Sequence, residues 1–273
     1  MSDIKKSVED FINSEGFPLE MYVAREFRKA GFTTYQSSIY LDPETKKERE
    51  IDITAYMPRV YLNTSFNIKI IIECKVALSP WILFSGDNSD LEKLEIHNFY
   101  CSNYAGNILL QRLTDSEGFS NRNWFKQNIE SGYGLTEVNT KKSKAEEYDL
   151  KYSYKALTSI LNALKYEKQT DRSPYQRDIN ICIPIIVIDG RLFKCCLDSD
   201  DEIKVDEISE GQIIYKHNVY PGVFPIIEII TKGNVATIAQ KISADIDLIF
   251  SDYLEIAKDI AITYPTDPAK HIH

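Results

Sequence analysis

The stretch IKIIIECK at residues 68 to 75 decides the fold that we predict for this chain. It is rich in β-branched residues and apolar on both faces until its last residues, a pattern typical of a central strand that is covered on both sides. Because alternate residues of a strand point the same way, Glu73 and Lys75 share one face, whereas Ile72 and Cys74 share the other. The predicted strand therefore ends with an acidic and a basic side chain next to each other.

A helix is predicted upstream of this strand, from Pro18 to Ala30. Proline is favoured in the first turn of a helix, the last turn is basic, and Gly31 follows as a stop signal. Glu20 lies on the apolar side of this helix, because apolar residues follow it at offsets of three, four and seven. A carboxylate in that position needs a functional or structural reason.

Two strands between the helix and the central strand are predicted to form a hairpin. They span Thr33 to Tyr40 and Glu50 to Tyr56, and residues 42 to 47 between them have the composition of a turn. Asp52 projects from one face of the second strand, while the isoleucines on either side of it can enter the core. Asp52 can therefore face Glu73 across neighbouring strands.

The carboxylates of Asp52 and Glu73 are predicted to bind a metal ion. Two neighbouring carboxylates repel each other unless a hard cation or a proton relieves them. Mg²⁺ typically binds one or two carboxylates and keeps waters and substrate phosphate in its other positions, so we expect Mg²⁺ here, with Mn²⁺ as a substitute. Lys75 is predicted to orient the nucleophile or to stabilise charge that develops on phosphorus. Glu20 is predicted to hold a second metal ion or a metal-bound water.

The order of these segments resembles the restriction-endonuclease-like PD-(D/E)XK superfamily. The matching segments are GFPLE at 16 to 20, REIDI at 49 to 53 and IIECK at 71 to 75. The proline of the family name is absent, because Ile51 precedes Asp52. The resemblance implies a catalytic and metal site formed by Asp52, Glu73, Lys75 and Glu20. It covers residues 16 to 84, and it implies a core that helix 145 to 168 and strand 181 to 188 complete.

The resemblance implies a metal-dependent nuclease that hydrolyses phosphodiester bonds, in DNA rather than RNA, with a Mg²⁺-activated water. Two alternatives come from other classes. One is a catalytically silent module of the same fold that binds nucleic acid or protein. The other is a glycosidase that uses a pair of carboxylates. This hypothesis ranks last because it gives Lys75 no role.

The whole chain, residues 1 to 273, is expected to form a single α/β domain with a central mixed sheet flanked by helices. Beyond the core motifs at 16 to 84, the pattern predicts a helical insertion at about 91 to 168, further strands and a long terminal helix at about 181 to 258, and a tail at 259 to 273.

Two parts of this downstream pattern are more detailed predictions. Within the insertion, helices are expected at 91 to 113 and 145 to 168, joined by an exposed loop that contains Gly132 and Gly134. The pair Asp189-Gly190 predicts a hairpin turn between strands 181 to 188 and 192 to 197.

Composition places the chain among ordinary soluble globular proteins, with 43% hydrophobic and 27% charged residues. The first residues contain no apolar run that resembles a secretory signal, and no window approaches the roughly 20 apolar residues of a membrane span. We therefore expect a cytoplasmic protein that does not enter a membrane. The five cysteines lack zinc-site spacing and are expected to be reduced and structural.

The net charge of −9 is opposite in sign to that of a protein held on DNA by nonspecific phosphate contacts. Residues 1 to 80 carry 11 Lys and Arg against 12 Asp and Glu, a net charge of −1, so the remainder carries −8. A DNA-cleaving chain of this charge must use a local surface within residues 1 to 80, or share a basic surface with a second copy or another protein. We expect the shared surface, and we expect weak DNA binding by the isolated monomer.

Overall fold

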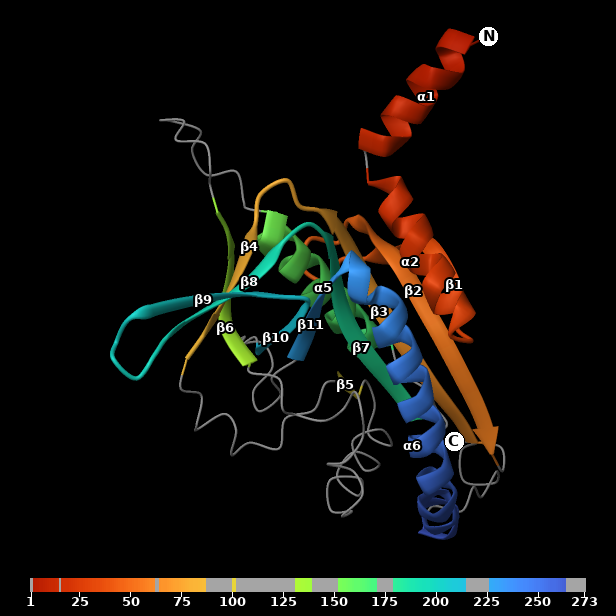
Figure 1. Cartoon of the computed structure of the whole chain (residues 1–273). Helices are drawn as coiled ribbons and strands as arrows, with labels where there is room; N and C mark the ends of the chain where they lie inside the picture. The colour runs from red at the N-terminus through yellow and green to blue at the C-terminus, as the bar shows by residue number, and fades with distance from the viewer. Residues whose placement is uncertain are drawn as a thin grey trace.

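The computed structural model describes residues 2–14, 16–61, 64–86, 100–101, 131–138, 152–170, 179–214 and 226–263. In this part of the chain, one mixed sheet of eleven strands carries helices on both of its faces (Figure 1). The α/β class and the mixed sheet that the sequence predicts are therefore confirmed.

The described helices are α1 (Ser2–Ser14), α2 (Phe17–Lys29), α5 (Tyr152–Thr170), the short 3-10 helix η2 (Lys232–Asn234) and α6 (Val235–Thr263). The strands are β1 (Thr33–Leu41), β2 (Glu48–Tyr61), β3 (Thr64–Val76), β4 (Trp81–Ser85), β5 (Tyr100–Cys101), β6 (Ser131–Glu137), β7 (Ile179–Asp189), β8 (Leu192–Leu197), β9 (Ile203–Ile208), β10 (Glu210–Ile214) and β11 (Ile226–Thr231). Their order in the sheet is β1-β2-β3-β7-β11-β10-β6-β4-β8-β9, and β5 pairs with β7.

The elements around β3 follow the predicted order. β1 and β2 form an antiparallel hairpin, and β2 pairs antiparallel with β3. β3 then pairs with β7 in parallel, from Phe66 opposite Ile179 to Val76 opposite Asp189. A parallel pair needs a crossover connection, and α5 lies in this one. The predicted hairpin, central strand and following helix are confirmed for the described residues.

Two apolar cores lie on the two faces of the sheet. On one face, α2 and α6 pack against β2, β3 and β7 through residues such as Phe27, Ile72 and Ile242. On the other face, α5 covers the sheet through residues such as Leu157 and Leu164. β3 contributes to both cores, which explains why it is apolar on both faces. Its last residues therefore lie between helices of both layers.

Helix α2 begins where the sequence indicates. Gly16 adopts a left-handed conformation with φ 83° before the helix, and Pro18 occupies the first turn. Gly31, with φ 94°, follows the helix and lets the chain turn into β1. Leu19, Val23 and Phe27 are buried on the inner side of α2. The position of this helix places Glu20 at the end of β3 that carries Glu73.

The sheet bends where β3 continues into β4 and where β7 continues into β8. The two bends lie against each other, because Ala77 N donates to Asp189 O at 3.0 Å and Trp81 N donates to Arg191 O at 2.9 Å. Beyond them, β4 and β8 pair in parallel, as β3 and β7 do. The hairpin predicted at Asp189-Gly190 is therefore wrong. A Cβ on Gly190 would lie 2.6 Å from Ala77 O, so glycine permits the close approach of the two bends here.

The predicted helical insertion at about 91 to 168 also needs correction. Tyr100 and Cys101 form β5 rather than part of a helix, and most of the predicted helix at 91 to 113 lies outside the described residues. The predicted loop around Gly132 and Gly134 contains β6, which pairs with β4 and β10. A Cβ on Gly132 would lie 2.3 Å from the Leu83 side chain, so the glycine that suggested a loop permits close packing of a strand.

Helices near the two ends of the chain differ from expectation. The sequence pattern does not predict α1, and in Figure 1 this helix projects away from the sheet. α6 continues through Thr263, so the predicted tail at 259 to 273 begins later than expected, and residues from 264 lie outside the described part. No helix in the described ranges is long and apolar enough to cross a membrane.

Candidate active site

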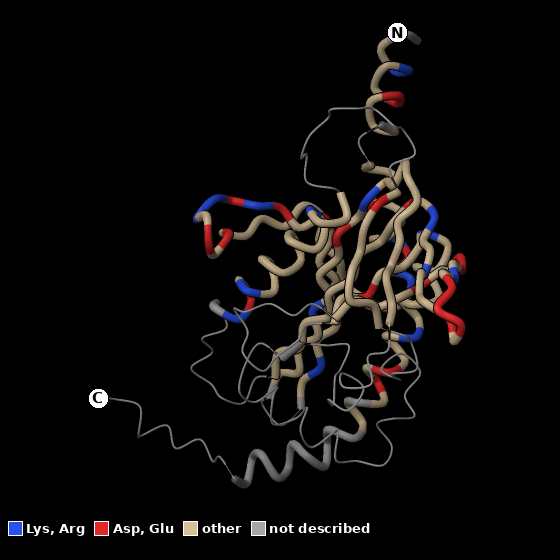
Figure 2. Tube along the Cα trace, turned by 90° about the vertical axis from the view of Figure 1, so that its left-hand side faces the viewer, with Lys and Arg blue, Asp and Glu red and all other residues tan. Residues whose placement is uncertain are grey.

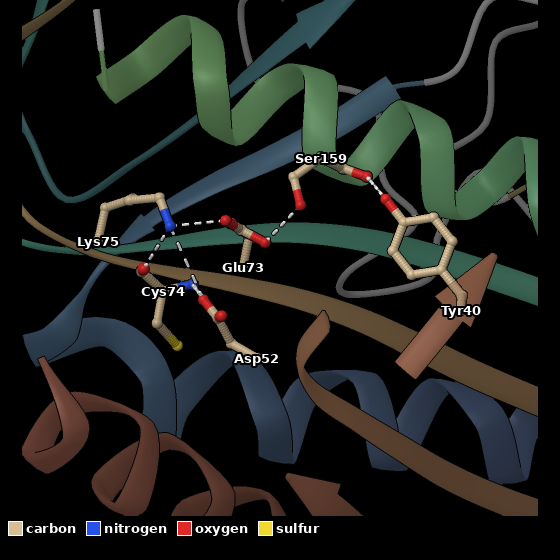
Figure 3. Close-up of polar contacts among 6 residues, drawn as sticks. All are labelled: Tyr40, Asp52, Glu73, Cys74, Lys75 and Ser159. Atoms are coloured by element: carbon tan, nitrogen blue, oxygen red, sulfur yellow. Dashed lines mark hydrogen bonds and ion pairs between the residues drawn. The ribbon is translucent and has the colours of Figure 1, made fainter. Parts of the chain in front are cut away.

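Asp52 lies where β2 separates from β3. The ladder between these strands runs from Tyr61 opposite Thr64 to Ile53 opposite Ile72 and does not include Asp52. Beyond it, the backbone N–H of Cys74 donates to Asp52 Oδ2 at 2.7 Å (Figure 3). The carboxylate therefore takes the place of a strand carbonyl, and this bond holds Asp52 beside the end of β3.

Lys75 lies between two carboxylates. Its Nζ donates to Glu73 Oε1 at 2.6 Å and lies 3.9 Å from Asp52 Oδ2. It also donates to Cys74 O at 3.2 Å. All three side chains are mostly withdrawn from solvent, so the attraction between them is screened less than at an open surface. The structure thus brings together Asp52, Glu73 and Lys75, three of the four residues that the sequence predicts to share a site.

Glu73 has a further partner on α5 that the sequence analysis missed. Ser159 Oγ donates to Glu73 Oε2 at 2.9 Å, and the Tyr40 hydroxyl donates to Ser159 O at 3.3 Å (Figure 3). Glu73 is therefore fixed by Lys75 on one oxygen and by Ser159 on the other. Ser159 lies 86 residues from Glu73 in the sequence, and no motif marks it.

Glu20, from the first turn of α2, is the outermost carboxyl group of the predicted set. Burial, followed by the negative charges of Asp52 and Glu50, raises the pKa of Glu20 to about 7. Glu73 raises this pKa further, whereas Lys75 lowers it. Glu20 therefore lies close enough to the cluster to interact with it electrostatically. Its role as a metal ligand remains a prediction.

The cluster holds more carboxylates than its one lysine can neutralise. Burial, followed by repulsion from Asp52, raises the pKa of Glu73 to about 7. Burial also raises the pKa of Asp52, although Lys75 and the Cys74 N–H oppose this change. For Lys75, burial lowers the pKa, but the Glu73 and Asp52 carboxylates outweigh it and raise the pKa overall. Lys75 stays charged, and the excess negative charge near neutral pH favours a bound proton or a bound cation.

This electrostatic arrangement predicts how stability depends on pH. Between about pH 4.5 and pH 7, the folded chain binds more protons at Glu20 and Glu73 than the unfolded chain does, so these groups reduce the free energy of unfolding as pH rises. In EDTA, the free energy of unfolding should fall from pH 5 to pH 8 by a smaller amount in Glu20→Gln than in wild type. The difference between the two decreases should be about 1 kcal/mol after allowance for solvent screening. Thermal unfolding at both pH values measures this difference. Identical pH dependence in the two proteins would contradict it.

The oxygen ligands in this cluster suit a hard cation such as Mg²⁺. Asp52 and Glu73 supply two carboxylates, and Mg²⁺ sites commonly use one or two protein carboxylates together with water and substrate phosphate. The described residues contain no group of three His, Cys, Asp or Glu side chains arranged to hold a metal ion by themselves. The arrangement therefore fits a two-carboxylate site that substrate and water complete, with Glu20 at its margin.

Comparisons of the chain with protein-family models, curated proteins and solved structures each found no match. The interpretation of this site therefore depends on its own geometry and on the sequence motifs.

Proposed function

We propose that this protein is a metal-dependent nuclease that hydrolyses phosphodiester bonds, with DNA as its substrate. The observation that carries the proposal is the convergence of Asp52, Glu73 and Lys75 at the point where β2 leaves β3, with Lys75 Nζ 2.6 Å from Glu73 and 3.9 Å from Asp52. The order α2, β1, β2, β3, α5 and β7 agrees with the core that the PD-(D/E)XK resemblance implies.

The proposed mechanism assigns different tasks to these side chains. Asp52 and Glu73, with Glu20 at the margin, would hold Mg²⁺, which supplies an activated water and polarises the scissile phosphate. Lys75 carries a fixed positive charge and can stabilise negative charge that develops on the phosphate oxygens. Ser159 holds Glu73 in place from α5, while the Cys74 N–H holds Asp52. These contacts keep the carboxylates in position before substrate arrives.

The charge distribution supports a shared DNA-binding surface within this proposal. In Figure 2, the positions of acidic and basic residues are interspersed along the coloured part of the trace, without a long run of basic positions. A duplex that contacts only this part of the chain would meet few positive charges without neighbouring negative ones. We therefore propose that a second copy or another protein completes the basic surface.

A cleavage assay tests the proposed function. The purified full chain is incubated with supercoiled, linear, single-stranded and branched DNA, and with RNA, in Mg²⁺, Mn²⁺ or EDTA. We expect cleavage of at least one DNA substrate with Mg²⁺ or Mn²⁺ and none with EDTA. Cation binding without cleavage of any nucleic acid would contradict the proposal and favour a catalytically silent module.

A further inference from the structure

A cavity of about 570 Å³ lies between β4, β6 and the hairpin of β8 and β9. Phe84 and Tyr133 form one wall, with near-parallel rings whose centroids are 6.4 Å apart. Leu197 and Ile203 from the hairpin form another. None of the residues of the proposed nuclease site lines this cavity, so its function can be considered separately.

Ser85 is a buried polar residue in the wall of this cavity. The residue is 6% exposed, and its Oγ has no hydrogen-bond partner within the described part of the chain. A buried hydroxyl that lacks a partner reduces stability, and such groups are uncommon in folded proteins. The hydroxyl is closed off from solvent in this structure, so a ligand atom would reach it and remove this cost only after the cavity wall moves.

An exposed apolar surface continues from the cavity along the hairpin. Leu197 lies directly opposite Ile203, and Cys195 lies opposite Val205, so these four residues share one face. Leu197, Ile203 and Val205 are 63%, 73% and 52% exposed. β9 is also the last strand of the sheet in the described chain, so its outer edge is a place where an extended segment can pair. Contiguous apolar surface of this kind is typical of a protein interaction site.

The charge of the turn that joins β8 to β9 indicates which partner charge would be complementary. Residues 198 to 202 read DSDDE and hold four acidic side chains and no basic one, all exposed to solvent. Phosphate groups would be repelled at this rim, so a nucleic-acid backbone does not fit it. Lysine and arginine side chains complement it.

We propose that this cavity and the edge of β9 bind an extended basic segment of a partner protein, which inserts a tyrosine beside Ser85. A tyrosine has an apolar ring that fits between the cavity walls and a hydroxyl that can bond to Ser85. The lysines or arginines of the segment would lie beside the acidic turn, and its backbone would pair with β9. This inference does not depend on the proposed nuclease activity.

Defined peptides test the proposal. Fluorescence anisotropy with the full chain compares KVKYKVK, KVKFKVK and the acidic EVEYEVE, and alkylation of Cys195 reports whether the cavity is covered. We expect KVKYKVK to bind, to protect Cys195 and to bind about five- to tenfold more tightly than KVKFKVK, the effect of one hydrogen bond. Ser85→Ala should remove that preference, because the hydroxyl it pairs with is lost.

Two variants locate the binding surface. Ile203→Asp should weaken KVKYKVK binding at least about tenfold by placing a charge in the apolar face. Ile39→Asp, at a position that is 68% exposed on β1 at the opposite end of the sheet, is the matched control and should leave binding unchanged. The proposal fails if no basic peptide binds at about 1 mM, if EVEYEVE binds equally well, or if Ile203→Asp has no effect. Protection of Cys195 by an oligonucleotide instead would also overturn it.

Discussion

Lys75→Ala is expected to bind a divalent cation and yet to cleave DNA at least about a hundredfold more slowly than wild type, the usual scale for losing one group that stabilises developing charge. A protonated lysine cannot coordinate a cation, so its removal leaves the carboxylate ligands of Asp52 and Glu73 in place. It also removes the positive charge that lies 2.6 Å from Glu73 and 3.9 Å from Asp52. Binding and cleavage should therefore separate in this variant.

Calorimetry with Mn²⁺ or Mg²⁺ measures the first quantity, and single-turnover cleavage measures the second. Lys165→Ala is a matched control, because Lys165 forms an ion pair with Glu44 at the same distance of 2.6 Å, outside the cluster. This control should cleave at the wild-type rate. Wild-type cleavage by Lys75→Ala would remove Lys75 from the mechanism.

Asp52→Asn and Glu73→Gln are expected to abolish both divalent-cation binding and cleavage while the chain still folds. An amide lacks the negative charge that attracts a hard cation. In Asp52→Asn the amide oxygen can still accept from the Cys74 N–H, and in Glu73→Gln it can still accept from Ser159. Each variant thus keeps the described backbone or helix contact and loses the charge.

Calorimetric titration with Mg²⁺ and Mn²⁺ tests these variants, with circular dichroism to establish that they fold. Glu44→Gln is the matched control, since it removes a carboxylate that pairs with Lys165 and lies outside the cluster. Unchanged cation affinity in both Asp52→Asn and Glu73→Gln would show that the metal site is assigned to the wrong residues.

The parts of the fold that can be predicted from the sequence are those with strong local signals. The apolar run of β3, the turn between β1 and β2, and the glycine after α2 each depend on neighbouring residues, so periodicity and turn chemistry are sufficient to locate them. The convergence of Asp52, Glu73 and Lys75 can also be predicted once the consecutive strands β2 and β3 are paired, because the period of two along each strand then sets which side chains share a face.

The parts that sequence analysis missed depend on distant contacts. Gly132 and Gly190 resemble turn residues, but their role is to let Leu83 and Ala77 approach closely, and nothing near them in the sequence reports those partners. Ser159 contacts Glu73 only because α5 packs across β3. The bends that join β3 to β4 and β7 to β8 likewise depend on pairing between segments more than 100 residues apart.

The bond between Asp52 and the Cys74 N–H has a consequence for how this protein can change during evolution. The carboxylate completes the backbone bonding of β3, so losing it would leave a buried N–H without a partner and destabilise the fold. A descendant that lacked the proposed activity would still be under selection to keep an acceptor at position 52. Retention of Asp52 in a related chain would thus indicate a folding requirement as much as a catalytic one, whereas retention of Lys75 would be the better sign of the proposed activity.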